Sequence, residues 1–174
     1  MKKFAAIAAG LLLGVSAQAV STHGNEKNAF RRQQYILQSD SISIAGVTSV
    51  GGSLKLYDLP EGNIIIHGVV ADVVATAGTN VLVTGETLNF GVGTAANANG
   101  AWAASETNLG SSAIAFTSGV TRAQSILAAP VRIDGTASAA DIYLNVFSTN
   151  ALVTNGSVSV VGQVQVLWSQ VGDY

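Results

Sequence analysis

The chain has 174 residues, and its hydrophobic share of 48% predicts one domain with a substantial core rather than a disordered polyelectrolyte. Charged residues make up 10%, against about 25% in an average soluble domain, and the net charge of −2 argues against nucleic-acid binding as the main function. The absence of cysteine excludes disulfides, thiol nucleophiles and thiolate metal sites.

The first nineteen residues have the pattern of a secretory signal. Met1–Lys3 is basic, Phe4–Val15 is a 12-residue apolar segment, and Ala17–Ala19 has the small residues of a cleavage site. The apolar segment is too short to span a membrane. We therefore expect cleavage after Ala19; the alternative is an apolar arm that stays attached and docks on a partner.

The next segment, residues 20–34, is polar and shows no apolar periodicity, which predicts an exposed N-terminal arm. It holds three of the six Lys and Arg residues that follow residue 19. The basic and aromatic residues of the arm and its boundary are Lys27, Phe30, Arg31, Arg32 and Tyr35. The arm is either a solvated leader or a segment that grips a neighbouring subunit.

From residue 35 to 174 the pattern is that of strands and turns in a single domain. Residues 35–44 end in the alternating run Ser41–Ile44, and residues 53–57 alternate as well. Residues 58–63 contain Pro and Gly and predict a turn. Residues 63–75 form the longest β-branched run, which predicts a strand buried on both faces.

The second half of the chain continues this pattern. Small residues at 93–100 predict a loop, and residues 121–128 predict a short helix that ends before Pro130. Asn155-Gly156 is expected in a loop or a short hairpin turn before the last strand. Strands are predicted at 87–92, 111–116, 141–147 and 157–168. Because strands recur without long helices between them, we expect an all-β fold, an antiparallel β-sandwich, jelly-roll-like, with an extended N-terminal arm.

Histidine chemistry finds little support in the sequence. His67 lies within the apolar run, and Asp72 is five positions away, an odd offset that places the two on opposite faces of a regular strand. The other histidine, His23, lies in the arm. We expect His67 to be a hydrogen-bonded strand residue without a catalytic or metal-binding role.

Other candidate motifs are equally weak. Residues 91–96 spell G-x-G-x-x-A, but the asparagines and glycine that follow disfavour the helix that a dinucleotide fingerprint requires. The turn carboxylates Asp58, Glu61 and Asp134 lack the alternating ligand spacing of a calcium loop. We therefore expect no enzyme activity, no catalytic residues, no cofactor and no metal site.

Several short segments resemble small virion proteins of tailed bacteriophages. They are Leu54–Gly62 (LKLYDLPEG), Asp134–Ala137 (DGTA), Asp141–Asn145 (DIYLN) and Trp168–Tyr174 (WSQVGDY). Proteins of that kind are β-rich and are found beside the major capsid protein, and the decoration (cement) proteins among them bind the outside of the head. The resemblance implies a structural protein and no catalytic residues.

The leading functional expectation is a structural virion protein that decorates or cements the capsid surface. Its partners would be the major capsid protein or neighbouring copies of itself in a homo-oligomer, with no nucleic acid and no membrane. Phe30 would be the apolar anchor, with the arm's basic residues pairing carboxylates. The alternative is an exported bacterial β-sandwich subunit of a cell-surface, matrix or fibre assembly, cleaved after Ala19. A secreted hydrolase is disfavoured because acid–base groups are missing.

Overall fold

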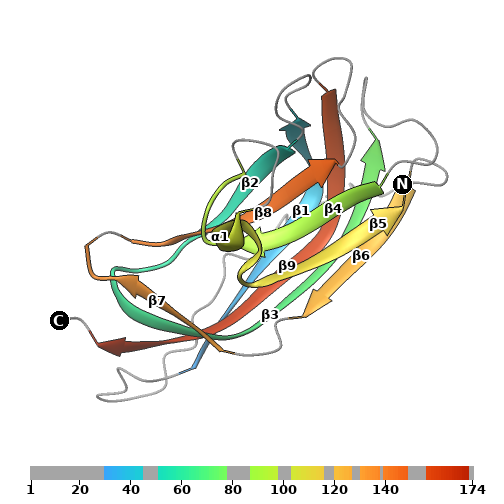
Figure 1. Cartoon of the computed structure of the whole chain (residues 1–174). Helices are drawn as coiled ribbons and strands as arrows, with labels where there is room; N and C mark the ends of the chain where they lie inside the picture. The colour runs from blue at the N-terminus through green and yellow to red at the C-terminus, as the bar shows by residue number, and fades with distance from the viewer. Residues whose placement is uncertain are drawn as a thin grey trace, which may run out of the picture.

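Two antiparallel β-sheets pack face to face (Figure 1). The computed structural model describes residues 30–44, 51–77, 87–97, 103–115, 120–126, 130–137, 139–148 and 156–172. Sheet A contains, in spatial order, β1 (Arg31–Ile44), β9 (Gly156–Gly172), β3 (Gly62–Ala77) and β6 (Val120–Ile126), and β7 (Val131–Gly135) also pairs with β3. Sheet B contains β2 (Gly51–Asp58), β8 (Asp141–Ser148), β4 (Thr87–Gly93) and β5 (Gly110–Ala115). A single turn of helix, α1 (Ala104–Thr107), lies between β4 and β5.

The strands pair from the two ends of the chain inward. β1 pairs with β9, β2 with β8, β3 with β6, and β4 with β5. This is the pairing of a long antiparallel ribbon that has been rolled up, which defines a jelly roll. The predicted all-β, jelly-roll-like sandwich is therefore confirmed.

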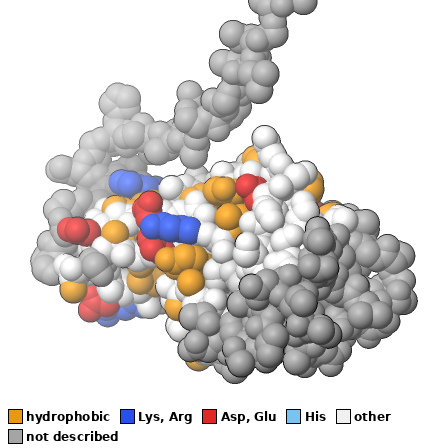
Figure 2. All heavy atoms as spheres, turned by 90° about the horizontal axis from the view of Figure 1, so that it is seen from above, with side chains coloured by type: hydrophobic (Ala, Val, Ile, Leu, Met, Phe, Trp, Pro, Cys, Tyr) orange, Lys and Arg blue, Asp and Glu red, His pale blue; other side chains and the backbone are white. Residues whose placement is uncertain are grey.

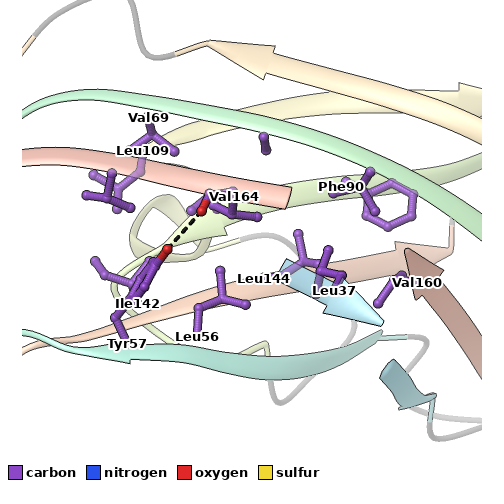
Figure 3. Packing of buried hydrophobic residues seen from close by; sticks show 14 of the residues in the cluster. Leu37, Leu56, Tyr57, Val69, Phe90, Leu109, Ile142, Leu144, Val160 and Val164 are labelled. Atoms are coloured by element: carbon purple, nitrogen blue, oxygen red, sulfur yellow. Dashed lines mark hydrogen bonds between the residues drawn. The ribbon is translucent and has the colours of Figure 1, made fainter. Parts of the chain in front are cut away.

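The core lies between the two sheets and consists of aliphatic side chains from both (Figure 3). Tyr57 is the polar exception at its centre: its hydroxyl crosses from β2 to donate to the Val164 carbonyl of β9 at 2.8 Å. Burial raises the pKa of Tyr57, so this hydroxyl stays a donor to a higher pH than an exposed tyrosine would. Trp168 closes one end of the core and donates to Gln33 Oε1 at 3.0 Å.

The expectation that residues 63–75 are buried on both faces is wrong. The ladder shifts register between Ile66 and Gly68, so the buried positions change from Ile64 and Ile66 to Val69 and beyond. The other face carries Val70, which is 44% exposed. A β-bulge explains why β-branched residues crowd this run without alternating: the alternation changes phase in its middle.

β1 contains a second bulge. Ser39 has a φ of 69°, and the register shifts between Gln38 and Asp40. Asp40 stabilises the bend by accepting a bond from the Gln38 backbone N–H at 3.0 Å. Before the bulge Leu37 points into the core, and after it Ile42 does.

Four segments differ from their prediction. Residues 121–128 were expected to be helical, but β6 runs to Ile126 and pairs with β3 over seven positions, a tertiary contact that overrides the helix preference of its Ala and Gln. β7 and α1 were not expected. β1 begins at Arg31, so residues 31–34 of the expected arm belong to the ladder with β9.

The segments before residue 30 lie outside the described residues, and so do the predicted cleavage site and Asn155. Among the residues that the structure describes, no helix combines the length and apolarity that crossing a membrane requires.

Val164 offers a direct test of this core. We expect Val164→Asp to lower the free energy of unfolding by more than about 4 kcal/mol, because the fully buried site would receive an unpaired carboxylate. Urea denaturation followed by tryptophan fluorescence measures the change. The control is Val161→Asp, on the same strand but 44% exposed, which should change stability by about 1 kcal/mol or less. Equal stability of the two variants would contradict the assigned orientation of β9.

Candidate interaction surface

The solvent-facing side of β1, β9 and β3 in sheet A forms one continuous surface, which we call the outer A face. The strand registers align its residues in rows. From one end the rows are Arg32, Leu167 and Gly68; Gln34, Gln165 and Val70; Ile36, Gln163 and Asp72; and Gln38, Val161 and Val74. No described segment lies over these rows, and their members are exposed or half-buried.

The outer A face exposes large aliphatic side chains. Ile36 is 51% exposed, Val161 44% and Leu167 40%, and Val70 lies between them on β3. Single exposed hydrophobic residues are ordinary, but neighbouring rows of them on a flat sheet are typical of an interaction site.

Glutamines fill the spaces between these aliphatic residues. Gln163 Oε1 accepts from Gln34 Nε2 at 2.6 Å and from Gln165 Nε2 at 3.3 Å, which links β1 to β9 at the surface. Arg32 and Asp72 are the charged members of the described rows. Figure 2 views the molecule from above, and among the described residues of that face the charged side chains form small groups between uncharged ones.

One end of the outer A face carries an aromatic cluster. Phe30 is 66% exposed, and its ring meets the His67 ring edge to face at a centroid distance of 4.6 Å. His67 Nε2 lies 2.8 Å from the Ser169 hydroxyl. Phe30 therefore projects from the strand end as an apolar group that is available to a partner.

The His67–Ser169 pair does not form a nucleophilic site with the groups that the structure describes. Ser169 is buried, and no described carboxylate contacts His67. The expected opposite placement of His67 and Asp72 is wrong, because the bulge at His67 puts both on the outer A face. They remain about 16 Å apart along β3, five residues at about 3.3 Å each, so they cannot act together.

The five residues expected to bind a partner are split by the structure. Phe30 and Arg32 lie on the outer A face. Arg31 points to the other side, where its guanidinium lies 5.1 Å from the centre of the Trp168 ring. Tyr35 is half-buried against the core and meets Tyr57 edge to face at 6.0 Å. Lys27 lies outside the described residues.

The outer side of sheet B differs because the chain covers part of it, around Asn145. Asn145 of β8 points outward yet is fully buried, since its Nδ2 donates to the carbonyls of Ala95 at 2.9 Å and Glu106 at 2.8 Å. Its Oδ1 accepts from Ser53 Oγ at 2.6 Å and from the Asn97 backbone N–H at 3.0 Å. One side chain thus fixes the segment that follows β4 across the sheet. Sequence reasoning missed this role, because a lone Asn in an alternating strand gives no signal of what covers it.

The buried carboxylate beneath that segment is paired as well. Glu106 Oε2 accepts from Asn97 Nδ2 at 2.9 Å and from the Ala103 N–H at 3.0 Å. Gly93, part of the G-x-G-x-x-A pattern, is required for close approach, since a Cβ there would lie 2.3–2.4 Å from the backbone of Ser105 and Glu106. Gly93 of this motif therefore serves packing.

Two of the three turn carboxylates considered as calcium ligands, Asp58 and Asp134, have protein partners. Lys55 pairs with Asp58 and, at 3.0 Å, with Asp141, which also accepts from the Tyr143 hydroxyl at 2.8 Å. The carboxylates of Asp58 and Asp141 raise the pKa of Lys55. The pKa of Asp141 is lowered, mainly by its bond to Lys55 and next by its bond to the Tyr143 hydroxyl. Asp134 accepts from the Thr136 side chain and backbone. Within the described ranges, no group of three His, Asp or Glu is arranged to hold a metal ion.

Comparison with known proteins finds distant structural similarity. The sequence matches no protein-family model and no curated protein. A chain of the cyanophage Pam1 capsid asymmetric unit gives a TM-score of 0.41 at 16% identity, over 88% of this chain and 94% of that one. A chain of infectious bursal disease virus, Gt strain, gives 0.42 at 13% identity, over 91% of this chain and 38% of that one. A CBM4 structure gives 0.38 at 13% identity, over 76% and 92%. These similarities concern the strand arrangement and indicate no shared function.

His67 should contribute to stability and not to any activity. We expect His67→Ala to lower the free energy of unfolding by about 1–2 kcal/mol, through loss of the Ser169 hydrogen bond and the Phe30 contact. Thermal denaturation measures the effect, with Ser169→Ala as the variant that removes the same hydrogen bond. Loss of partner binding with an unchanged circular dichroism spectrum would instead show that His67 has a direct functional role.

Asp141 should contribute to the pH dependence of stability. Because its pKa is lowered in the folded protein, the Lys55 pair stabilises above the ordinary carboxyl pKa near 4, and this contribution is lost as the pH falls through the lowered value. Asp141→Asn should therefore flatten the acid side of the stability curve, measured by urea denaturation from about pH 7 to pH 2. The control is Glu61→Gln, an exposed carboxylate whose side chain has no partner among the described residues. If Glu61→Gln flattens the acid side of the stability curve as much as Asp141→Asn does, the pH dependence does not come from the Asp141–Lys55 pair.

Proposed function

We propose that the protein is a structural, non-enzymatic subunit of a virion surface, where it decorates or cements the outside of a capsid. The observation that carries this proposal is the exposed pair Phe30 and Arg32 at the end of the outer A face, a sheet surface with few charged residues. A surface of this kind suits attachment to another protein surface. The sequence segments that resemble small phage virion proteins suggest a phage capsid as the assembly to which the subunit belongs.

The composition supports a subunit that works at high local density. A chain with 10% charged residues and a net charge of −2 repels its own copies weakly, so many copies can sit side by side. The β-sandwich supplies rigidity, since its long strands are paired along most of their length. The partners are the major capsid protein and neighbouring copies of this chain.

Phe30 and Arg32 form the anchor to the capsid in this proposal. They lie on the same side of β1, at the strand end, and both are exposed. An aromatic ring that fills a pocket next to a desolvated arginine is the usual composition of a binding hot spot. Arg31 is adjacent in sequence, but its guanidinium lies over the Trp168 ring, so it is not part of the anchor.

A second candidate function is an exported bacterial subunit of a cell-surface, matrix or fibre assembly. The sequence pattern of Met1–Ala19 favours it, because a secretory signal directs a chain out of the cytoplasm. The N-terminal mass of the mature protein separates the two functions. A chain that begins at Val20 supports export, and a chain that retains Met1–Ala19 supports virion assembly.

The attachment prediction uses two adjacent arginines as a matched pair. We expect Phe30→Ala and Arg32→Gln each to weaken binding to purified capsids about tenfold or more, as loss of a hot-spot residue does. Arg31→Gln removes the same charge one residue away and should leave binding within about twofold. Co-sedimentation with capsids at low and high salt measures the affinity, and electron microscopy of untagged material shows where the protein sits. Equal effects of Arg31→Gln and Arg32→Gln would overturn the assigned anchor, and absence of the protein from capsids would overturn the virion function.

A further inference from the structure

We infer that the central rows of the outer A face, from Gln34 to Val161, are a contact surface for a second copy of this chain. This goes beyond the proposed function, because it concerns the purified protein without any capsid. The first reason is that the outer sides of the two sheets are covered differently. The segment fixed by Asn145 covers part of the outer side of sheet B, whereas no described segment covers the aliphatic residues of the outer A face.

The glutamines identify the second copy as the occupant. Gln163 Oε1 accepts both internal bonds of the cluster, so the Nε2 donors of Gln163 have no partner among the described residues. The Oε1 atoms of Gln34 and Gln165 likewise accept no hydrogen bond from a side chain among the described residues. The surface therefore offers donors next to acceptors. An identical face turned by a twofold axis supplies acceptors to those donors and donors to those acceptors.

Charge allows the same pairing. Asp72 is the charged residue of the three central rows, and Arg122 of β6 stands opposite Val74 in the ladder, so charged positions at this face are few and two copies meet with little repulsion. Val70, Val161 and Ile36 then bury apolar surface against their counterparts.

The area of the face sets the strength of the contact. Three strands about 4.8 Å apart and about seven residues of about 3.3 Å each give a footprint of roughly 330 Å². A standard stable interface buries about 800 Å² on each partner. The contact is therefore weak, with a dissociation constant above about 1 µM, and it matters where copies are already held close together.

The experiment compares two valines on β9 that are exposed to the same degree. Val161 is 44% exposed within the face, and Val171 is 45% exposed on the same strand, beyond the end of β1. Sedimentation equilibrium of the full chain between about 10 µM and about 1 mM should show self-association. We expect Val161→Lys to weaken it at least tenfold and Val171→Lys to leave it unchanged. Circular dichroism and thermal denaturation establish that both variants are folded.

An isosteric change tests the amide pairing independently of the aliphatic contact. Gln163→Glu replaces the donors by a charge without changing the size of the side chain, so it should weaken self-association, and added salt should partly restore it. No self-association up to about 1 mM, or equal effects of Val161→Lys and Val171→Lys, would overturn the inference. Failure of capsid attachment would leave these results unaffected, so the two proposals fail separately.

Because the chain has no cysteine, a single introduced thiol identifies the occupant. In Val161→Cys, the rate of thiol labelling should fall as the protein concentration rises, while Val171→Cys should label at a constant rate. Protection of Val161→Cys that persists at the highest dilution would mean that a segment of the same chain covers the face, and the inference of a second copy would be wrong.

Discussion

The sandwich depends on keeping one apolar face on strands that are too long to remain in phase. β1 and β3 each run the length of sheet A, and each interrupts its alternation once, at Ser39 and at His67. Without the first bulge, Ile42 would turn toward solvent, since a slip of one residue exchanges the two faces of a strand. The bulges therefore make a continuous core possible, and they also decide which residues reach the outer A face.

The two outer surfaces of the molecule follow from different local chemistry. On sheet B, Asn145 provides the polar bonds that hold a loop segment in place, and glycine at position 93 lets the backbone come close. On sheet A, the three glutamines that project outward from β1 and β9 bond to one another, and the aliphatic residues around them stay exposed. Part of the outer side of sheet B is thus covered by its own chain, and the outer A face remains suited to a partner.

Much of the fold could be predicted from the sequence because most strands alternate locally. The exceptions have physical causes. Residues 121–126 carry no local signal strong enough to outweigh helix formers, and their strand state depends on pairing with β3. Of the residues expected to bind a partner, Phe30 and Arg32 are exposed on one side of β1, but Arg31 alternates to the side of Trp168, which could be known only once β1 was seen to begin at Arg31. The glutamine cluster joins residues 129 positions apart, a distance that no local pattern spans.

The position of β9 has a consequence for how the protein is made. This strand is the last of the described elements to be synthesised, yet it lies between β1 and β3 in the middle of sheet A. During translation β1 and β3 therefore lack the strand that joins them, and both expose hydrogen-bonding edges until β9 leaves the ribosome. Chains that stall before residue 156 leave β1 without its partner in sheet A and one edge of β3 unpaired. Such chains are substrates for chaperones or for aggregation rather than partially active subunits.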